Sequence, residues 1–273
     1  MKTQENPTAL SQKFGLVFGM PTLIESPEAA DCAALCGELG LSFIELNMNL
    51  PQYQIGQMQP DLLLALADKA GIFYTIHLDE NCNPFDFNPA VSEAYSQTVL
   101  DAIALAKRLR VPILNLHLSK GVYFTLPEKR VYLFAAYRSD YLTKVRAFRE
   151  SCEQAIGSAD IKIAIENCDG YTDFQREAIA ILLESPVFGL TFDIGHNHGC
   201  GGADTDVMHR YENRLCHIHM HDASGKKNHL PLGTGELPLA DYLALAQKRH
   251  CRVVLETKTI RALRQSVAYL MNL

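Results

Sequence analysis

Short apolar runs alternate with longer amphipathic segments along the whole chain. The runs are nearly continuous and rich in β-branched and aromatic residues, which is typical of strands buried on both faces of a parallel sheet. These predicted strands occupy residues 14–18, 42–46, 72–78, 112–118, 161–166, 189–194, 215–221 and 252–256.

The segments between the strands carry apolar residues at every third or fourth position, the spacing of a helix with one buried face. Gly40 and Gly71 end two of these segments, and four prolines stand near helix starts, as expected of helix boundaries. The predicted helices span residues 28–39, 61–69, 91–109, 131–156, 174–183, 239–249 and 260–270.

Strand followed by helix, about eight times, predicts an α/β fold of the (β/α)8 barrel type. The competing fold is an open doubly wound sheet, but the chain has no Gly-rich GxGxxG turn after its first predicted strand. No linker or low-complexity stretch divides the sequence. We therefore expect residues 1–273 to form a single domain, with residues 1–12 as an N-terminal tail.

Composition narrows the classes of function. The chain is 48% hydrophobic, which excludes a disordered protein, and its net charge of −6 without a basic block does not predict nucleic-acid binding. Its apolar runs are far shorter than the roughly 20 residues that cross a bilayer. The 8 cysteines form no CxxC pair, and the N-terminus lacks a secretory signal. These features favour a reducing cytoplasm.

Residues with carboxylate or imidazole side chains stand near the carboxyl-terminal ends of seven of the eight predicted strands. In a (β/α)8 barrel, such ends meet at one mouth, where the chemistry is placed. Several buried carboxylates would repel one another there, and a divalent cation would replace that repulsion with coordination. The residues are Glu45, His77, His117, Glu166, Asp193, His217, His219, His221, Asp222 and Glu256.

Each of these residues also has a structural interpretation. Glu166 could pair with a cation at a strand end, and Asp193 could cap the turn that follows it. The alternation of His217, His219 and His221 places them on one face of a strand, either the lumen or the helix layer. The Gly-rich segment 199–204 could cradle a phosphate. Taken together, the strand-end residues favour a metal site.

The ordered motifs IEN (Glu166), FDxGH (Asp193 and His196), HxHxHD (His219) and LET (Glu256) resemble those of the xylose-isomerase-like TIM-barrel superfamily. That superfamily includes sugar and sugar-phosphate isomerases and epimerases, some dehydratases, and the endonuclease-IV class of abasic-site nucleases. The resemblance implies one divalent metal ion held by Glu166, Asp193, His219 and Glu256. Such mixed ligation accommodates manganese, zinc, cobalt or magnesium, of which we expect manganese or zinc.

The function expected from this resemblance is a metal-dependent isomerase or epimerase of a small sugar, a polyol-derived ketose or a sugar phosphate. Glu166 and Glu256 would move a proton to and from a metal-stabilised enediolate. Substrate contacts are expected from four histidines: His77, His117, His196 and His229. The expected partner is a small carbohydrate substrate. No membrane association is expected, and the chain could form a homo-oligomer.

Three rival functions are compatible with the same residues. The additional histidines favour an endonuclease-IV-like zinc phosphodiesterase acting on abasic DNA, whereas Lys227 stands where that branch has a ligating Asp. A dehydratase of the same superfamily uses the same abstraction of an α-proton. A catalytically silent barrel that binds a metabolite is the third rival, although it would not need two proton-transferring glutamates.

Overall fold

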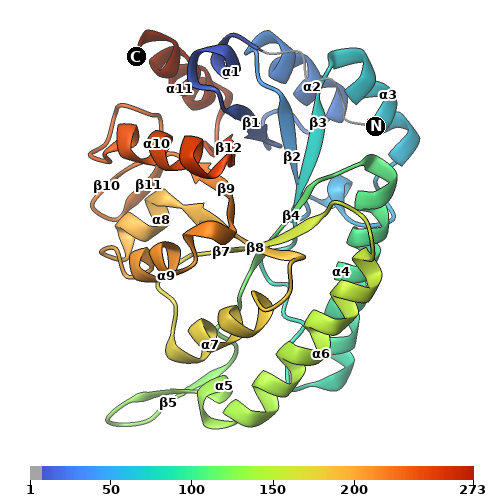
Figure 1. Cartoon of the computed structure of the whole chain (residues 1–273), viewed down its shortest axis with the longest axis vertical. Coiled ribbons are helices and arrows are strands. Elements are labelled where there is room, and N and C mark those ends of the chain that lie inside the picture. The colour runs from blue at the N-terminus through green and yellow to red at the C-terminus, as the bar shows by residue number, and fades with distance from the viewer. Residues whose placement is uncertain (1–7) are drawn as a thin grey trace.

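Eight parallel strands close into a barrel in the computed structural model, which describes residues 8–273 (Figure 1). Around the barrel the order is β1, β12, β9, β8, β7, β4, β3 and β2, and β2 pairs again with β1. The predicted (β/α)8 fold is confirmed. The strands are β1 (Val17–Pro21), β2 (Phe43–Asn47), β3 (Phe73–His77), β4 (Ile113–His117), β7 (Lys162–Glu166), β8 (Phe188–Asp193), β9 (Leu215–Met220) and β12 (Arg252–Leu255).

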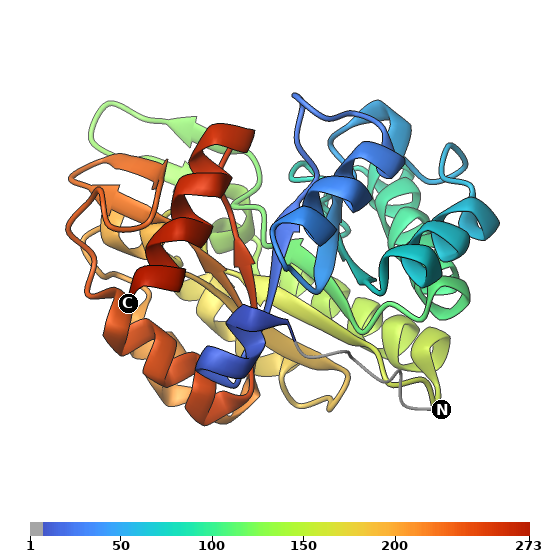
Figure 2. The same ribbon diagram turned by 90° about the horizontal axis from the view of Figure 1, so that it is seen from above.

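Helices surround the barrel on its outside, as the view from above shows (Figure 2). No helix among residues 8–273 combines the length and the apolar character needed to cross a membrane. The longer helices are α2 (Ala29–Glu38), α3 (Pro60–Ala70), α4 (Pro89–Leu109), α6 (Arg138–Ile156), α7 (Asp173–Leu182), α10 (Leu239–Arg249) and α11 (Ile260–Asn272). Shorter ones are α1 (Ala9–Phe14), α5 (Leu133–Ala136), α8 (Ile194–Gly199), α9 (Thr205–Arg210) and the 3₁₀ turns η1 (Pro51–Tyr53) and η2 (Glu212–Arg214).

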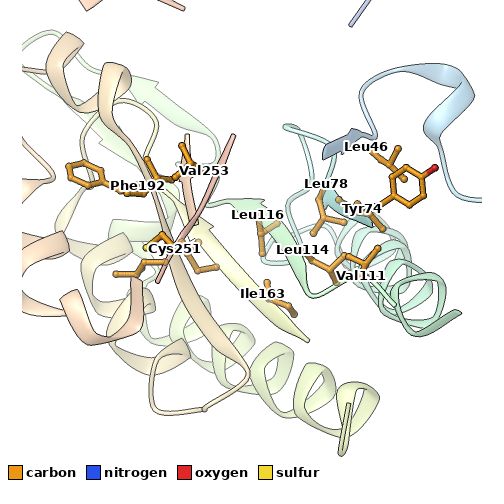
Figure 3. Close-up of a cluster of buried hydrophobic side chains, with 14 of the residues drawn as sticks. Leu46, Tyr74, Leu78, Val111, Leu114, Leu116, Ile163, Phe192, Cys251 and Val253 are labelled. Atoms are coloured by element: carbon orange, nitrogen blue, oxygen red, sulfur yellow. The ribbon is translucent and has the colours of Figure 1, made fainter. Parts of the chain in front are cut away.

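The side chains of each strand alternate between two environments. Leu114, Leu116 and Ile163 come from adjacent strands and belong to the buried apolar layer against the helices (Figure 3). The opposite face of β4 carries Asn115, which lies in the lumen beside Glu166. Apolar packing between the outer faces of the strands and the helices therefore supports the fold, and polar groups such as Asn115 and Glu166 can occupy inward positions.

Residues 131–156 do not form the single helix expected from their spacing. Val131 lies in β6 (Arg130–Tyr132), which pairs antiparallel with β5 (Tyr123–Thr125) in a projecting hairpin (Figure 1). The helix then forms as two pieces, α5 and α6, separated at Tyr137. The aromatic pairing of Tyr123 with Tyr132 across the hairpin, with ring centroids 5.5 Å apart, competes with the helical periodicity.

The segment expected to be an N-terminal tail, residues 1–12, includes the first four residues of helix α1, and its residues 1–7 lie outside the described part of the chain. Thr8 caps α1 through a reciprocal pair of hydrogen bonds with Ser11, and Leu10 is buried. The expected first strand therefore begins later, at Val17, because Phe14 ends α1 and Gly15 adopts a left-handed conformation behind it.

Replacement of Leu10 by alanine tests whether α1 is part of the core. Leu10 is 1% exposed, so Leu10→Ala should lower the free energy of unfolding by about 2–5 kcal/mol through lost burial and a residual cavity. The matched control is Leu62→Ala in α3, where the side chain is 52% exposed and the expected change is within about 0.5 kcal/mol. Urea unfolding measures both, and equal small effects would contradict the packing of α1.

Candidate functional site

Four side chains from neighbouring strands meet at the carboxyl-terminal mouth of the barrel. Glu166 ends β7, Asp193 ends β8, His219 lies in β9, and Glu256 directly follows β12. One potential ligand atom of each lies within 4.8 Å of those of the other three. All four side chains are buried, and the strand order places His219 and Asp193 between the two glutamates.

His219 occupies the centre of this group. Its Nδ1 lies 3.0 Å from Oε1 of Glu166 and 3.1 Å from Oε2 of Glu256. Burial by itself lowers the pKa of His219, but the surrounding carboxylates outweigh burial and raise that pKa well above its usual value. The same contacts hold the pKa values of Glu166 and Glu256 well below normal, although burial opposes them. Both glutamates are therefore ionised at neutral pH.

The second oxygen of Glu166 faces another set of donors. Oε2 lies 2.9 Å from Nε2 of His117 and 3.4 Å from Nε2 of His77, and it accepts a hydrogen bond from Asn115. The contact with Glu166 raises the pKa of His77 to about 9, against the opposing effect of burial. Glu166 thus keeps Oε1 toward the central group while Oε2 is held from β3 and β4.

Asp193 is fixed by the turn that follows it. Its Oδ1 accepts a 2.6 Å hydrogen bond from the backbone N–H of His196, so the expected capping role is present together with the position in the cluster. Nε2 of His221 lies 3.1 Å from both Asp193 oxygens. The backbone N–H of His229 donates to Nδ1 of His221 at 2.8 Å, so Nε2 is the nitrogen that can donate to Asp193.

Glu256 has one oxygen held by a cation and one oxygen without a donor. Lys258 Nζ donates to Oε1 at 2.8 Å, and Nδ1 of His229 lies 3.9 Å from that same oxygen. Oε2 is buried and lies 3.1 Å from Nδ1 of His219, but it accepts no aligned hydrogen bond from any described residue. A buried carboxylate oxygen in this condition is costly unless a cation approaches it.

The donor set at this position fits a divalent metal ion. Three carboxylates face one imidazole, so negative charge exceeds what His219 can neutralise, and the orphaned Oε2 of Glu256 lies on the shared side. Oxygen and nitrogen ligands in this combination suit manganese, zinc, cobalt or magnesium. The four residues expected to share a metal are therefore close enough to do so.

A second group of histidines lies beside the first. Ligand atoms of His196, His221 and His229 come within 4.8 Å of one another, on α8, after β9 and in β11 (Lys227–Leu230). Both ring nitrogens of His221 are already committed, one to Asp193 and one to the backbone of His229. This group therefore cannot offer three free nitrogens unless the support of Asp193 is broken.

The remaining polar candidates organise loops. Asp222, the first residue of β10 (Asp222–Ser224), accepts hydrogen bonds from the backbone N–H groups of Ala223, Gly233, Gly235 and Leu237 and so anchors the turn after β11. In the Gly-rich segment 199–204, the amides of Gly201 and Gly202 donate to carbonyls of α8. Those two amides close the turn and do not form a free phosphate cradle.

A family model described as a xylose isomerase-like TIM barrel matches residues 33–273. The chain belongs to the xylose isomerase-like TIM barrel family. It is also 26% identical over 192 residues to an uncharacterized protein of Methanocaldococcus jannaschii; the match covers 66% of this chain and 62% of that relative, less than two thirds of its length.

Solved structures of the same shape support the fold of this family member. A D-tagatose 3-epimerase-like protein has a TM-score of 0.77 at 21% identity, covering 94% of this chain and 96% of its own. The 3-keto-D-glucoside 4-epimerase of E. coli has a TM-score of 0.73 at 15% identity, covering 94% of this chain and 100% of its own. A probable 3-DHS dehydratase of Bacillus anthracis has a TM-score of 0.70 at 15% identity, covering 94% of this chain and 99% of its own. At these identities the likeness shows the fold alone.

Three residues near the site were missed by sequence reasoning. Asn115 lies inside β4 and Thr75 inside β3, and their polar side chains at lumen positions of apolar strands were the available signal. Lys258 comes directly after the LET motif, which ends at Thr257, and nothing in the sequence indicated its contact with Glu256. Polar residues at inward positions of these apolar strands therefore belong to the site, as the strand ends do.

The packing of Gly195 against His221 gives a testable prediction. A Cβ at Gly195 would lie 2.0 Å from Cε1 of His221, so Gly195→Ala should displace the ring from Asp193 and lower the free energy of unfolding by about 1–3 kcal/mol. Gly199→Ala in the same helix meets nothing within 4 Å and should be neutral or slightly stabilising. Chemical denaturation compares the two, and a neutral Gly195→Ala would contradict the contact.

Proposed function

We propose that this protein is a divalent-metal-dependent isomerase or epimerase of a small sugar, a polyol-derived ketose or a sugar phosphate. The observation that carries the proposal is the pair of buried, ionised glutamates, Glu166 and Glu256, which flank His219 from β7 and β12. The similarity to sugar epimerases of the same fold agrees with this reaction class.

Proton transfer at a substrate carbon needs a base on each face of that carbon for epimerisation, or one mobile base for isomerisation. Glu166 and Glu256 supply carboxylates from β7 and β12, on either side of His219, each with a pKa held low by His219 against the effect of burial. A metal ion held by Glu166, Asp193, His219 and Glu256 would supply positive charge against the oxygen anion that develops on the substrate. Lys258 keeps Oε1 of Glu256 oriented while Oε2 stays free of donors.

Substrate hydroxyls or a phosphate would contact histidines around the mouth. The side chains of His117, His196 and His229 are partly exposed, at 18%, 30% and 15%, whereas that of His77 is 6% exposed. Burial lowers the pKa of His229 to about 4, so this ring is neutral at neutral pH and would act as a hydrogen-bonding group. We propose all four as substrate contacts, with His77 acting deepest in the site.

Phosphodiester hydrolysis at abasic DNA is the second candidate, favoured by the additional clusters formed by His77, Glu166 and His219 and by His196, His221 and His229. The bonds that saturate His221 count against a third independent metal position. Lys227, in β11, is exposed and adds a cation where an anionic ligand would be needed. Metal content separates the two candidates.

The glutamates provide the direct test of the proposed reaction. Glu166→Gln and Glu256→Gln should each reduce turnover by at least about 10²–10⁴-fold, because the amide cannot accept the substrate proton. Deuterium entry from D2O into a panel of ketoses and sugar phosphates, followed by NMR, measures this step. Glu150→Gln, on the exposed face of α6, is the matched control and should keep full activity. Unchanged exchange in either active-site variant would reject its assigned role.

Metal content gives a second test. The purified protein saturated with manganese or zinc should retain about one ion per chain after removal of free metal, and Asp193→Asn should lose it, since one carboxylate ligand is replaced by a neutral amide. Elemental analysis with protein quantification measures the ratio. About three zinc ions per chain would instead support the nuclease.

A further inference from the structure

A charged side chain lies in the lumen directly beneath the candidate metal centre. Glu45, from β2, is 1% exposed, and its Oε2 accepts hydrogen bonds from Thr75 Oγ1 at 3.0 Å and from His217 Nε2 at 2.9 Å. Its other oxygen, Oε1, lies 2.9 Å from Nε2 of His219, as a charge contact without an aligned hydrogen bond. Glu45 therefore links the interior of the barrel to the central histidine.

The position of Glu45 is unusual for a barrel interior. A buried carboxylate is costly unless it is paired, and among the described residues its ion pairs are with His217 and His219, not with lysine or arginine. An apolar residue would fill this layer of the lumen without that cost. The carboxylate is therefore explained better by what it does to His219 than by stability.

We propose that Glu45 is a positioning residue that fixes the proton of His219 on Nε2 and so keeps Nδ1 available to a metal ion. An ionised carboxylate cannot donate a hydrogen bond, so once a metal ion replaces the proton on Nδ1, the proton that remains on Nε2 lies against Oε1 of Glu45, 2.9 Å away. The opposite nitrogen, Nδ1, is the one that lies between Glu166 and Glu256. This inference rests on the proposed metal-dependent function.

Carboxylate–histidine–metal arrangements orient the ring and raise the basicity of the ligating nitrogen, and their loss commonly costs 10–100-fold in metal affinity. In this chain the carboxylate comes from β2 and the imidazole from β9, two strands that are not neighbours in the barrel. The contact crosses the lumen. The barrel therefore positions His219 from below, whereas Glu166 and Glu256 approach it at the mouth.

The Glu45→Gln variant makes a sharp prediction because the orientation of the new amide is constrained. Thr75 and His217 both donate to the position of Oε2, so the amide oxygen takes that position. The NH2 group then faces Nε2 of His219 and donates to it, so Nε2 carries no proton and the ring proton is held on Nδ1, against Glu166. A substitution of nearly the same size would thus block the metal-facing nitrogen.

Equilibrium dialysis with Mn²⁺ tests this proposal on the full chain. Glu45→Gln should weaken binding by about 10–100-fold relative to the wild-type protein. Thr75→Val removes one hydrogen bond to Glu45 but leaves the carboxylate facing His219, and its affinity should stay within about threefold. Asp204→Asn provides a second control, because Asp204 is a buried carboxylate bonded to the backbone N–H of Tyr171 and outside the cluster.

A spectroscopic measurement on the wild-type protein keeps the proposal testable even if Glu45→Gln does not fold. In the Zn²⁺-loaded protein labelled with ¹⁵N-histidine, long-range ¹H–¹⁵N spectra should place the His219 proton on Nε2, with the signal identified by its loss in His219→Gln. Without metal, Nδ1 of His219 faces Glu166 in both proteins, so the wild-type ring should carry protons on both nitrogens and the Glu45→Gln ring should lose the proton on Nε2. If Glu45 had a merely structural role, Nε2 of His219 would stay protonated in the metal-free variant.

The outcomes separate the two proposals. Wild-type protein that binds neither Mn²⁺ nor Zn²⁺ would overturn the proposed metal-dependent function and this inference together. Wild-type binding with unchanged affinity in Glu45→Gln, or with an equal loss in Thr75→Val, would overturn the role of Glu45 alone. A His219 proton on Nδ1 in the Zn²⁺-loaded protein would also overturn that role and leave the proposed function standing.

Discussion

Mutual repulsion among three buried carboxylates is the constraint that organises this molecule. Glu166, Asp193 and Glu256 reach the same mouth from separate strands, with the His219 imidazole between them. Each carboxylate has its own outer support. Glu166 is held by His117 and Asn115, Asp193 by His221 and the backbone N–H of His196, and Glu256 by Lys258. These partners hold the oxygens close together although their charges oppose it.

The fold tolerates such a cluster because its apolar core lies elsewhere. Outward-facing side chains of the strands pack against the helices, and this layer supplies the burial that stabilises the barrel (Figure 3). The lumen can then hold a polar column that runs from His217 through Glu45 to His219 and the mouth. Stability and chemistry are thus assigned to opposite faces of the same strands.

The relatives show how little the barrel alone specifies. Structures of nearly the same shape include two epimerase-type proteins and a probable dehydratase, at identities of 15–21%. Function in such folds resides in the site and in the loops around it. Here those loops include the β5–β6 hairpin and the turn anchored by Asp222, whose shapes differ from simple strand-to-helix connections.

The sequence by itself determined the barrel and the residues at its strand ends, because strand and helix periodicities are local and the ends of parallel strands necessarily share one edge. It could not distinguish the β5–β6 hairpin from helix, since apolar spacing near Val131 suits both. The tertiary structure alone decided which side of β9 faces the lumen. It also decided the pairing of Glu45 with His219 across the barrel and the contact of Lys258 with Glu256. Those contacts depend on how the barrel closes, because closure brings together side chains that no local pattern relates.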